Sequence, residues 1–212
     1  MTLDTAVAAL TPSDVQIAVR LIFPGDEDAL APGERPDLDG ARVERRRQSG
    51  AARDLARGLL EPLVGVRPIL PRSVGGGPLW PEGVVGSLAH DRQVALAAVA
   101  PAALFAGIGV DVEPFAPLPG RLAAKIATEG ERRRGLADPA ELRVLLSVKE
   151  AVYKATHPGD GLFLGFQDVE VDLAEGLART STGRTLQVAV ARSPRILALA
   201  FIRRHAADDG RS

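Results

Sequence analysis

Cysteine is absent from this sequence of 212 residues, and aromatic residues make up only 4% of it. Without thiols there can be no disulfide and no thiolate metal site, and a reducing cytoplasm is the setting we expect. With so few aromatic rings, the core must consist mainly of alanine, valine and leucine. The formal net charge is only −1, which gives no bulk attraction to nucleic acid.

Long hydrophobic runs are missing as well. The longest uncharged stretch, residues 94–110, is interrupted by Pro101, Gly107 and Gly109. A helix needs about 20 apolar residues to cross a bilayer, so we interpret this stretch as two buried strands joined by a loop. The first ten residues lack the basic and apolar regions of a secretory signal. The sequence therefore predicts neither a membrane span nor export.

The remaining pattern indicates helices and antiparallel strands in two similar halves. A basic helical pattern covers residues 40–60, and a second helix should begin at Asp138, with Pro139 in its first turn and Glu141 completing a capping box. We expect Pro62 to end the first helix and the second to run to about Thr156. Three candidate strands follow each helix: residues 84–88, 94–100 and 107–113, then 168–173, 186–191 and 196–202.

No crossover helices separate these strands, which favours antiparallel sheets over a doubly wound parallel one. We therefore predict an α+β fold of two halves, residues 1–112 and 113–212, each with one long helix and a three-stranded sheet.

Two carboxylates stand out in the segment GVDVEP. Asp111 and Glu113 are two residues apart, so on a strand both side chains point to the same face. Such a pair of hard oxygen ligands suits Mg²⁺ or Mn²⁺, with phosphate oxygens and water completing the shell. The alternative is an exposed strand end that carries two solvated acids.

Two further segments carry candidate chemistry. In SVKEAVYKA, Glu150 and Lys154 are four residues apart on one helical face, and Arg143 and Ser147 extend that stripe backwards. Glu150 could be a third carboxylate and Lys154 a phosphate contact, or the two could form an ordinary surface salt bridge. In GSLAH, His90 follows a strand; it could donate to an anion or simply cap a turn.

The sequence resembles the 4′-phosphopantetheinyl transferase superfamily and its Sfp-type, EntD-like branch in the order and approximate spacing of three motifs: GSLAH, GVDVEP and SVKEAVYKA. The stretches PLWPEGVVGSLAH, ERRRQSGAARDLARGLL and LGF add to the likeness, which extends from about Arg42 to the last strand. The resemblance implies a pseudo-dimeric α+β fold with coenzyme A bound between the halves. It also implies transfer of the phosphopantetheine arm to a carrier-protein serine, with release of adenosine 3′,5′-bisphosphate.

The resemblance assigns roles to particular residues. Asp111, Glu113 and Glu150 would hold Mg²⁺, with Mn²⁺ as a possible substitute. Lys154 would contact the pantetheine-side phosphate, and the acceptor serine would lose its proton to Glu150 or to a metal-bound water. The adenosine end and its 3′-phosphate would be bound by Arg45, Arg53 and His90. Arg72 is a further cofactor-binding candidate in the first half.

Three positions depart from the family pattern: Leu146 replaces an aromatic residue, Ala89 replaces a hydroxyl residue, and the loop RSVGGG lacks the usual lysine, leaving Arg72 as the nearby cation. The expected partners are apo acyl or peptidyl carrier proteins of siderophore, polyketide or non-ribosomal peptide synthesis, and the enzyme is expected to be a monomer. Residues 121–136 mix apolar and basic side chains, which suits carrier docking or, equally, a solvated helix.

Two other functions fit parts of the pattern. A metal-dependent nucleotide-sugar transferase also uses paired acids, but it predicts a doubly wound sheet and a glycine-rich nucleotide loop, and neither is evident. A non-catalytic module that binds coenzyme A or a carrier protein predicts a damaged carboxylate set, whereas Asp111, Glu113 and Glu150 are all present.

Overall fold

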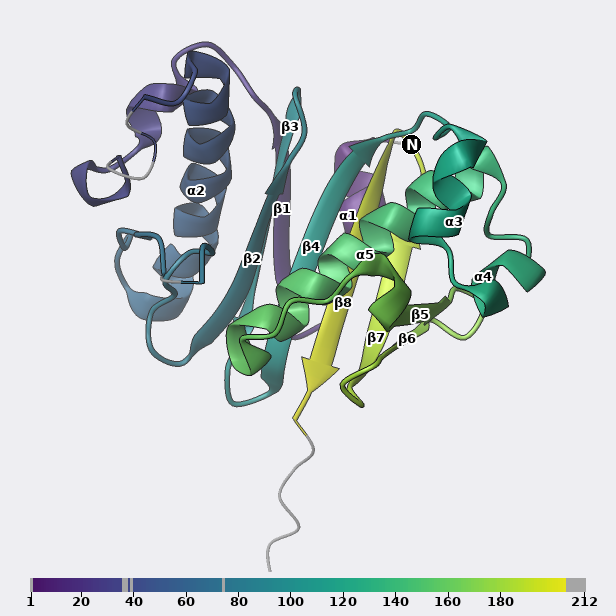
Figure 1. The fold of residues 1–212 in the computed structure, drawn as a ribbon. Helices are drawn as coiled ribbons and strands as arrows, with labels where there is room; N and C mark the ends of the chain where they lie inside the picture. Colours follow the sequence, from purple (N-terminus) through teal and green to yellow (C-terminus); the bar gives the residue numbers. More distant parts are fainter. Residues whose placement is uncertain (1, 36–37, 39, 74, 205–212) are drawn as a thin grey trace, which may run out of the picture.

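The computed structural model describes residues 2–35, 38, 40–73 and 75–204. Within these ranges the chain forms two antiparallel sheets and two long helices (Figure 1). The three-stranded sheet has the order β1-β3-β2, and the five-stranded sheet has the order β4-β8-β7-β6-β5. The strands span Gln16–Leu21 (β1), Val84–His90 (β2), Val94–Pro101 (β3), Phe105–Pro114 (β4), Val169–Asp172 (β5), Leu177–Thr180 (β6), Thr185–Ala191 (β7) and Arg195–Arg203 (β8). The predicted α+β class with antiparallel sheets is confirmed.

The two long helices, α2 (Val43–Val64) and α5 (Pro139–Asp160), lie against different sheets (Figure 1). The remaining helices are α1 (Leu3–Leu10), α3 (Ala123–Ile126) and α4 (Glu129–Arg133), with 3₁₀ turns at Asp26–Ala29, Pro32–Glu34, Gly120–Leu122 and Phe166–Asp168. Among the described residues, no helix combines the length and the hydropathy that a membrane crossing requires.

Both long helices run past their expected ends, α2 through Pro62 and α5 through Pro158. Their ends are set by Gly65 and Gly161, which adopt left-handed φ angles of 77° and 65° and close the last turns. Asp138 caps α5 as predicted, because its side chain accepts from the Ala140 backbone N–H at 3.0 Å. Glu141 was expected to complete a capping box, but it pairs instead with Arg192 of the loop before β8.

The strand expected at residues 107–113 does not belong to the first half's sheet. It forms part of β4, which pairs along its length with β8, so the predicted boundary at residue 112 falls inside this strand. The third strand of the first sheet is β1, and β6 also escaped the sequence pattern. The division into two halves stays a prediction, but the change of sheet occurs between Pro101 and Phe105.

Glycines on β4 explain why this strand lies so close to α5. A Cβ at Gly109 would fall 1.9 Å from the carbonyl oxygen of Ala151, and one at Gly107 would fall 2.1 Å from that of Ala155. On its other side β4 touches β2, where the Val110 N–H donates to Ser87 Oγ at 3.0 Å. β4 is therefore the strand at which the two sheets and α5 meet.

Candidate active site

The carboxylates of β4 both face α5, as their two-residue spacing predicted. Asp111 is 8% exposed and accepts hydrogen bonds from Lys154 Nζ at 2.8 Å and Ser147 Oγ at 2.9 Å. Glu113 accepts from Arg143 Nη1 at 2.7 Å. The polar stripe of α5 thus binds the end of β4, and the alternative of two solvated acids at a strand end is wrong for Asp111.

Glu150 lies on the same stripe of α5. Burial raises the pKa of its carboxyl, the negative charges of Asp111 and Glu113 raise it further, and Lys154 lowers it. Lys154 does not form the surface salt bridge with Glu150 that was the alternative, because its ammonium group binds Asp111 and the Val110 carbonyl. The negative charges of Asp111 and Glu113 therefore disfavour ionisation of Glu150, and Lys154 offsets part of that effect.

Asp111, Glu113 and Glu150 have the donor chemistry of a Mg²⁺ site, since Mg²⁺ takes oxygen ligands and is commonly held by one or two carboxylates plus substrate phosphates. In the described part of the chain, however, no three acidic, histidine or cysteine side chains form a ready-made metal cluster. Lys154 and Arg143 neutralise two of the acids instead. The residues fit a metal site that phosphate oxygens complete, not a site built from protein ligands alone.

A cavity of about 980 Å³ lies next to this carboxylate centre, with Lys154, the ion-pair partner of Asp111, in its wall. Its walls come from α2, the loop before β2, β2 itself and the C-terminal part of α5. All the residues predicted to bind the cofactor line it: Arg45, Arg53, Arg72, His90 and Lys154. The structure therefore brings together side chains that lie up to 109 positions apart in the sequence.

His90 and Arg45 are direct neighbours in the cavity, where Arg45 Nη1 contacts His90 Nε2. Burial lowers the pKa of His90 to about 4, and the charges of Arg45 and Lys154 contribute to the shift. Partial burial and the nearby charge of Arg72 also lower the pKa of Arg45. So many cations in one cavity favour a multiply charged anion as its ligand.

Arg53 and Arg72 are held by backbone oxygens. Arg53 Nε donates to the Leu70 carbonyl at 3.1 Å, and its guanidinium also contacts Ser49. Arg72 Nε donates to the Gly76 carbonyl at 3.1 Å, within the loop that replaces the family's lysine-containing segment. Both guanidinium groups line the cavity and are oriented by the chain itself.

The cavity residues that were not predicted include two aromatic side chains of α5. Tyr153 and His157 are four residues apart on α5, and their rings lie 5.0 Å apart at the end of the cavity beyond Lys154. Their spacing along α5 continues the stripe through Glu150, and this helical pattern is the sequence signal that could have identified them. Gly75 of the opposite loop lies so close that its Cβ would be 3.2 Å from the His157 ring.

Lys149, the neighbour of Glu150, has a structural role. Its side chain is 1% exposed and donates to Glu131 at 2.7 Å, to the Ile126 carbonyl at 2.8 Å and to the Phe166 carbonyl at 2.7 Å. These bonds tie residues 121–136 to α5.

Carrier docking, one of the two alternatives for residues 121–136, would use exposed apolar side chains, but Leu122, Ile126 and Leu136 are buried or partly buried. Ile126 is 3% exposed, and Leu122 and Leu136 pack against the core under α5. The solvated-helix alternative fits Glu129, which pairs with Arg133 at 3.5 Å, but not Glu131, which is the buried partner of Lys149.

Two family models cover most of the chain. The 4′-phosphopantetheinyl transferase N-terminal domain matches residues 34–100, and the 4′-phosphopantetheinyl transferase superfamily matches residues 107–200. This chain belongs to the 4′-phosphopantetheinyl transferase superfamily. The resemblance inferred from the three motifs is thereby confirmed.

Three curated proteins agree with this assignment. 4′-Phosphopantetheinyl transferase Npt of Nocardia iowensis is 34% identical over 183 residues, which is 84% of this chain and 82% of that protein. 4′-Phosphopantetheinyl transferase PptT of Mycobacterium tuberculosis is 34% identical over 184 residues, 81% of this chain and 78% of that protein. Enterobactin synthase component D of Salmonella typhi is 35% identical over 98 residues, 43% of this chain and 40% of that protein. This last match agrees with the EntD-like branch.

Proposed function

We propose that this protein transfers the 4′-phosphopantetheine arm of coenzyme A to a serine of an apo-carrier protein and releases adenosine 3′,5′-bisphosphate. The observation that carries the proposal is the cation-lined cavity of about 980 Å³, whose wall includes Lys154, the ion-pair partner of Asp111. Coenzyme A has a pyrophosphate and a 3′-phosphate, so it needs both a set of cations and a site that stabilises charge on a leaving phosphate.

In this proposal the adenosine end occupies the α2 side of the cavity. Arg45 and Arg53 would bind the 3′-phosphate, because guanidinium groups bind phosphate oxygens in a bidentate manner. Arg72, on the loop across the cavity, is a third candidate for a phosphate contact. His90 would take up a proton as the phosphate binds, since a dianion beside it offsets the cations that now depress its pKa.

The pyrophosphate would lie at the carboxylate centre. Asp111, Glu113 and Glu150 would hold Mg²⁺ there, and the ion, when bound, would neutralise charge on the pyrophosphate. Lys154 now compensates Asp111; with phosphate present it can turn its ammonium group to the pantetheine-side phosphate. The acceptor hydroxyl needs a base, and either Glu150, whose pKa is raised, or a water that it orients can serve.

Mass spectrometry tests the proposed function directly. The purified protein is incubated with coenzyme A, Mg²⁺ and an apo-carrier protein, and the carrier should gain the mass of one phosphopantetheine arm. Omitting Mg²⁺ or adding a chelator should stop the reaction. Coenzyme A binding without any mass gain, with several acyl and peptidyl carriers, would favour the non-catalytic module.

We further propose that the enzyme acts as a monomer in the cytoplasm on carriers of siderophore, polyketide or non-ribosomal peptide synthesis. The partial match to enterobactin synthase component D supports the siderophore branch. Parallel assays with one carrier from each type of synthesis would rank them by kcat/KM, and light scattering would measure the mass of the protein in solution.

A further inference from the structure

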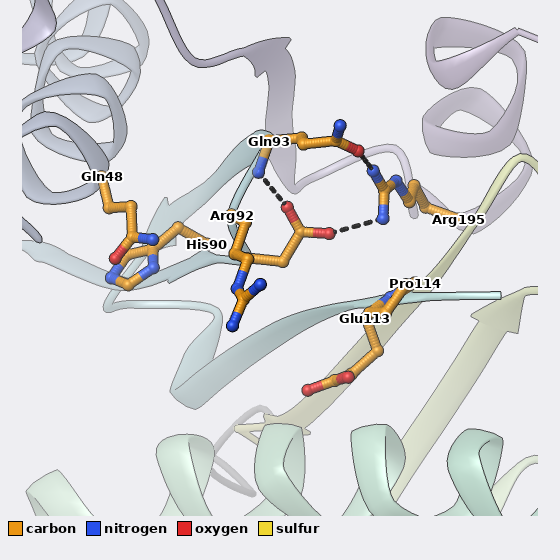
Figure 2. A pocket seen from close by; sticks show the side chains of 8 residues that line it. Gln48, His90, Arg92, Gln93, Glu113, Pro114 and Arg195 are labelled. Atoms are coloured by element: carbon orange, nitrogen blue, oxygen red, sulfur yellow. Dashed lines mark hydrogen bonds and ion pairs between the residues drawn. The ribbon is translucent and has the colours of Figure 1, made fainter. Parts of the chain in front are cut away.

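A second cavity of about 550 Å³ also has His90 in its wall (Figure 2). Its residues come from α2, from the end of β2 and the turn after it, from the end of β4 and from the start of β8. They are Gln48, His90, Asp91, Arg92, Gln93, Glu113, Pro114 and Arg195. Among the residues that line the two cavities, only His90 belongs to both. The small cavity contains Glu113 and the large one contains Lys154, so the carboxylate centre lies between them.

One wall of the small cavity is held by an ion pair between the two sheets. Asp91 accepts from Arg195 Nη1 at 2.8 Å, and both side chains are less than a fifth exposed. Asp91 also accepts from the backbone N–H groups of Gln93 and Val94 at 2.6 and 2.7 Å, and Gln93 contacts Arg195 (Figure 2). The turn after β2 is therefore fixed against the start of β8, and the cavity is preformed.

Arg92 is the cation of this cavity that has no partner in the part of the chain that the structure describes. Its side chain is exposed and makes no hydrogen bond or ion pair with any residue in the described ranges, whereas Arg195 is bound to Asp91. In Figure 2 the Arg92 guanidinium extends toward the space between His90 and Glu113. A guanidinium in this position is available to bind a carboxylate in a bidentate manner.

Phosphoryl transfer places the attacking and leaving oxygens on roughly opposite sides of the phosphorus. In the proposed function the leaving adenosine bisphosphate lies in the large cavity, so the attacking serine must arrive from another side of the carboxylate centre. The serine oxygen forms a bond to the pantetheine-side phosphorus as the bond to the bridging oxygen breaks. The bisphosphate leaves with that electron pair, and a base takes the serine proton. The small cavity, which opens onto Glu113, provides such a second approach.

We propose that the small cavity receives the acceptor loop of the carrier protein, and that Arg92 binds an acidic side chain next to the acceptor serine. This inference rests on the proposed function, because it names the side from which the substrate of that reaction enters. Arg92 would then select carriers by charge, while the Asp91–Arg195 ion pair keeps the entrance open.

The test compares Arg92→Ala and Arg92→Glu with Arg179→Ala, a matched change of an exposed arginine on β6. The substrate is an apo-acyl carrier protein with an acidic residue beside its serine, and transfer is followed by mass. Loss of one charge-assisted contact should lower kcat/KM for the carrier about 10- to 100-fold, with the larger loss for Arg92→Glu. KM for coenzyme A and the Arg179→Ala enzyme should be unchanged.

A charge exchange separates docking from indirect effects. A carrier whose acidic residue is replaced by lysine should be a poor substrate for the wild type and should regain activity with Arg92→Glu. Three results would overturn the inference: unchanged carrier kinetics in both Arg92 variants, an increase in KM for coenzyme A alone, which would make Arg92 a phosphate contact, or no rescue in the charge exchange. If the wild-type protein transfers no arm at all, the proposed function itself fails, whatever the variants do.

Discussion

Replacing Lys149 by methionine is expected to destabilise the fold strongly, because the change leaves a buried carboxylate without its cation. Lys149 and Glu131 are 1% and 0% exposed and lie 2.7 Å apart. Glu131 would keep its bonds from the backbone N–H groups of Val171 at 2.7 Å and Thr128 at 2.8 Å, but not its counter-charge. Breaking one side of such a buried pair costs about 3–5 kcal/mol.

The assay is urea unfolding of the wild type and of the single variants Lys149→Met and Glu131→Gln, together with the double variant. The double variant should lose less free energy of unfolding than the sum of the two single losses, because it buries no unpaired charge. Lys125→Met, which removes an exposed cation of α3, is the control and should change stability by about 0.5 kcal/mol or less. A loss below about 1 kcal/mol for Lys149→Met would refute the reasoning.

Three other predictions concern the site. Asp111→Asn should lower kcat about a hundredfold or more in the mass assay while circular dichroism stays unchanged; near-normal turnover at ordinary Mg²⁺ would contradict the metal assignment. Arg53→Ala should raise KM for coenzyme A much more than KM for 3′-dephospho-coenzyme A, whereas equal increases would make Arg53 a structural residue. The pKa of His90 is about 4 in the folded protein and ordinarily 6.5, so the fold favours the neutral imidazole. The stability that depends on this neutral form is present above pH 6.5 and is lost as pH falls toward 4. Between pH 7 and pH 4.5 the free energy of unfolding in urea should fall on the order of 2–3 kcal/mol in the wild type, and His90→Gln should not show this loss. The same loss in both proteins would mean that other groups cause it.

Local patterns in the sequence were sufficient for the two long helices and for the site residues within each motif, but not for α1. Asp138 and Pro139 began α5 where expected, and the spacings of Asp111 with Glu113 and of Glu150 with Lys154 correctly placed each pair on one face. These features depend on backbone periodicity and capping, which involve residues only a few positions apart. The helix ends were missed by four residues or fewer, since the left-handed glycines decided them and not the prolines.

Tertiary structure decided which strands pair and which side chains contact one another. β4 lies directly after the hairpin of β2 and β3, yet it pairs with β8, and Gly107 and Gly109 allow it to pack closely against α5. The pairing of Lys154 with Asp111 and the contact of Arg45 with His90 join residues more than 40 positions apart. Sequence alone gave no sign of the Asp91–Arg195 ion pair or of the cavity that it borders. Contacts of this kind depend on how the sheets pack together, which no spacing within one element specifies.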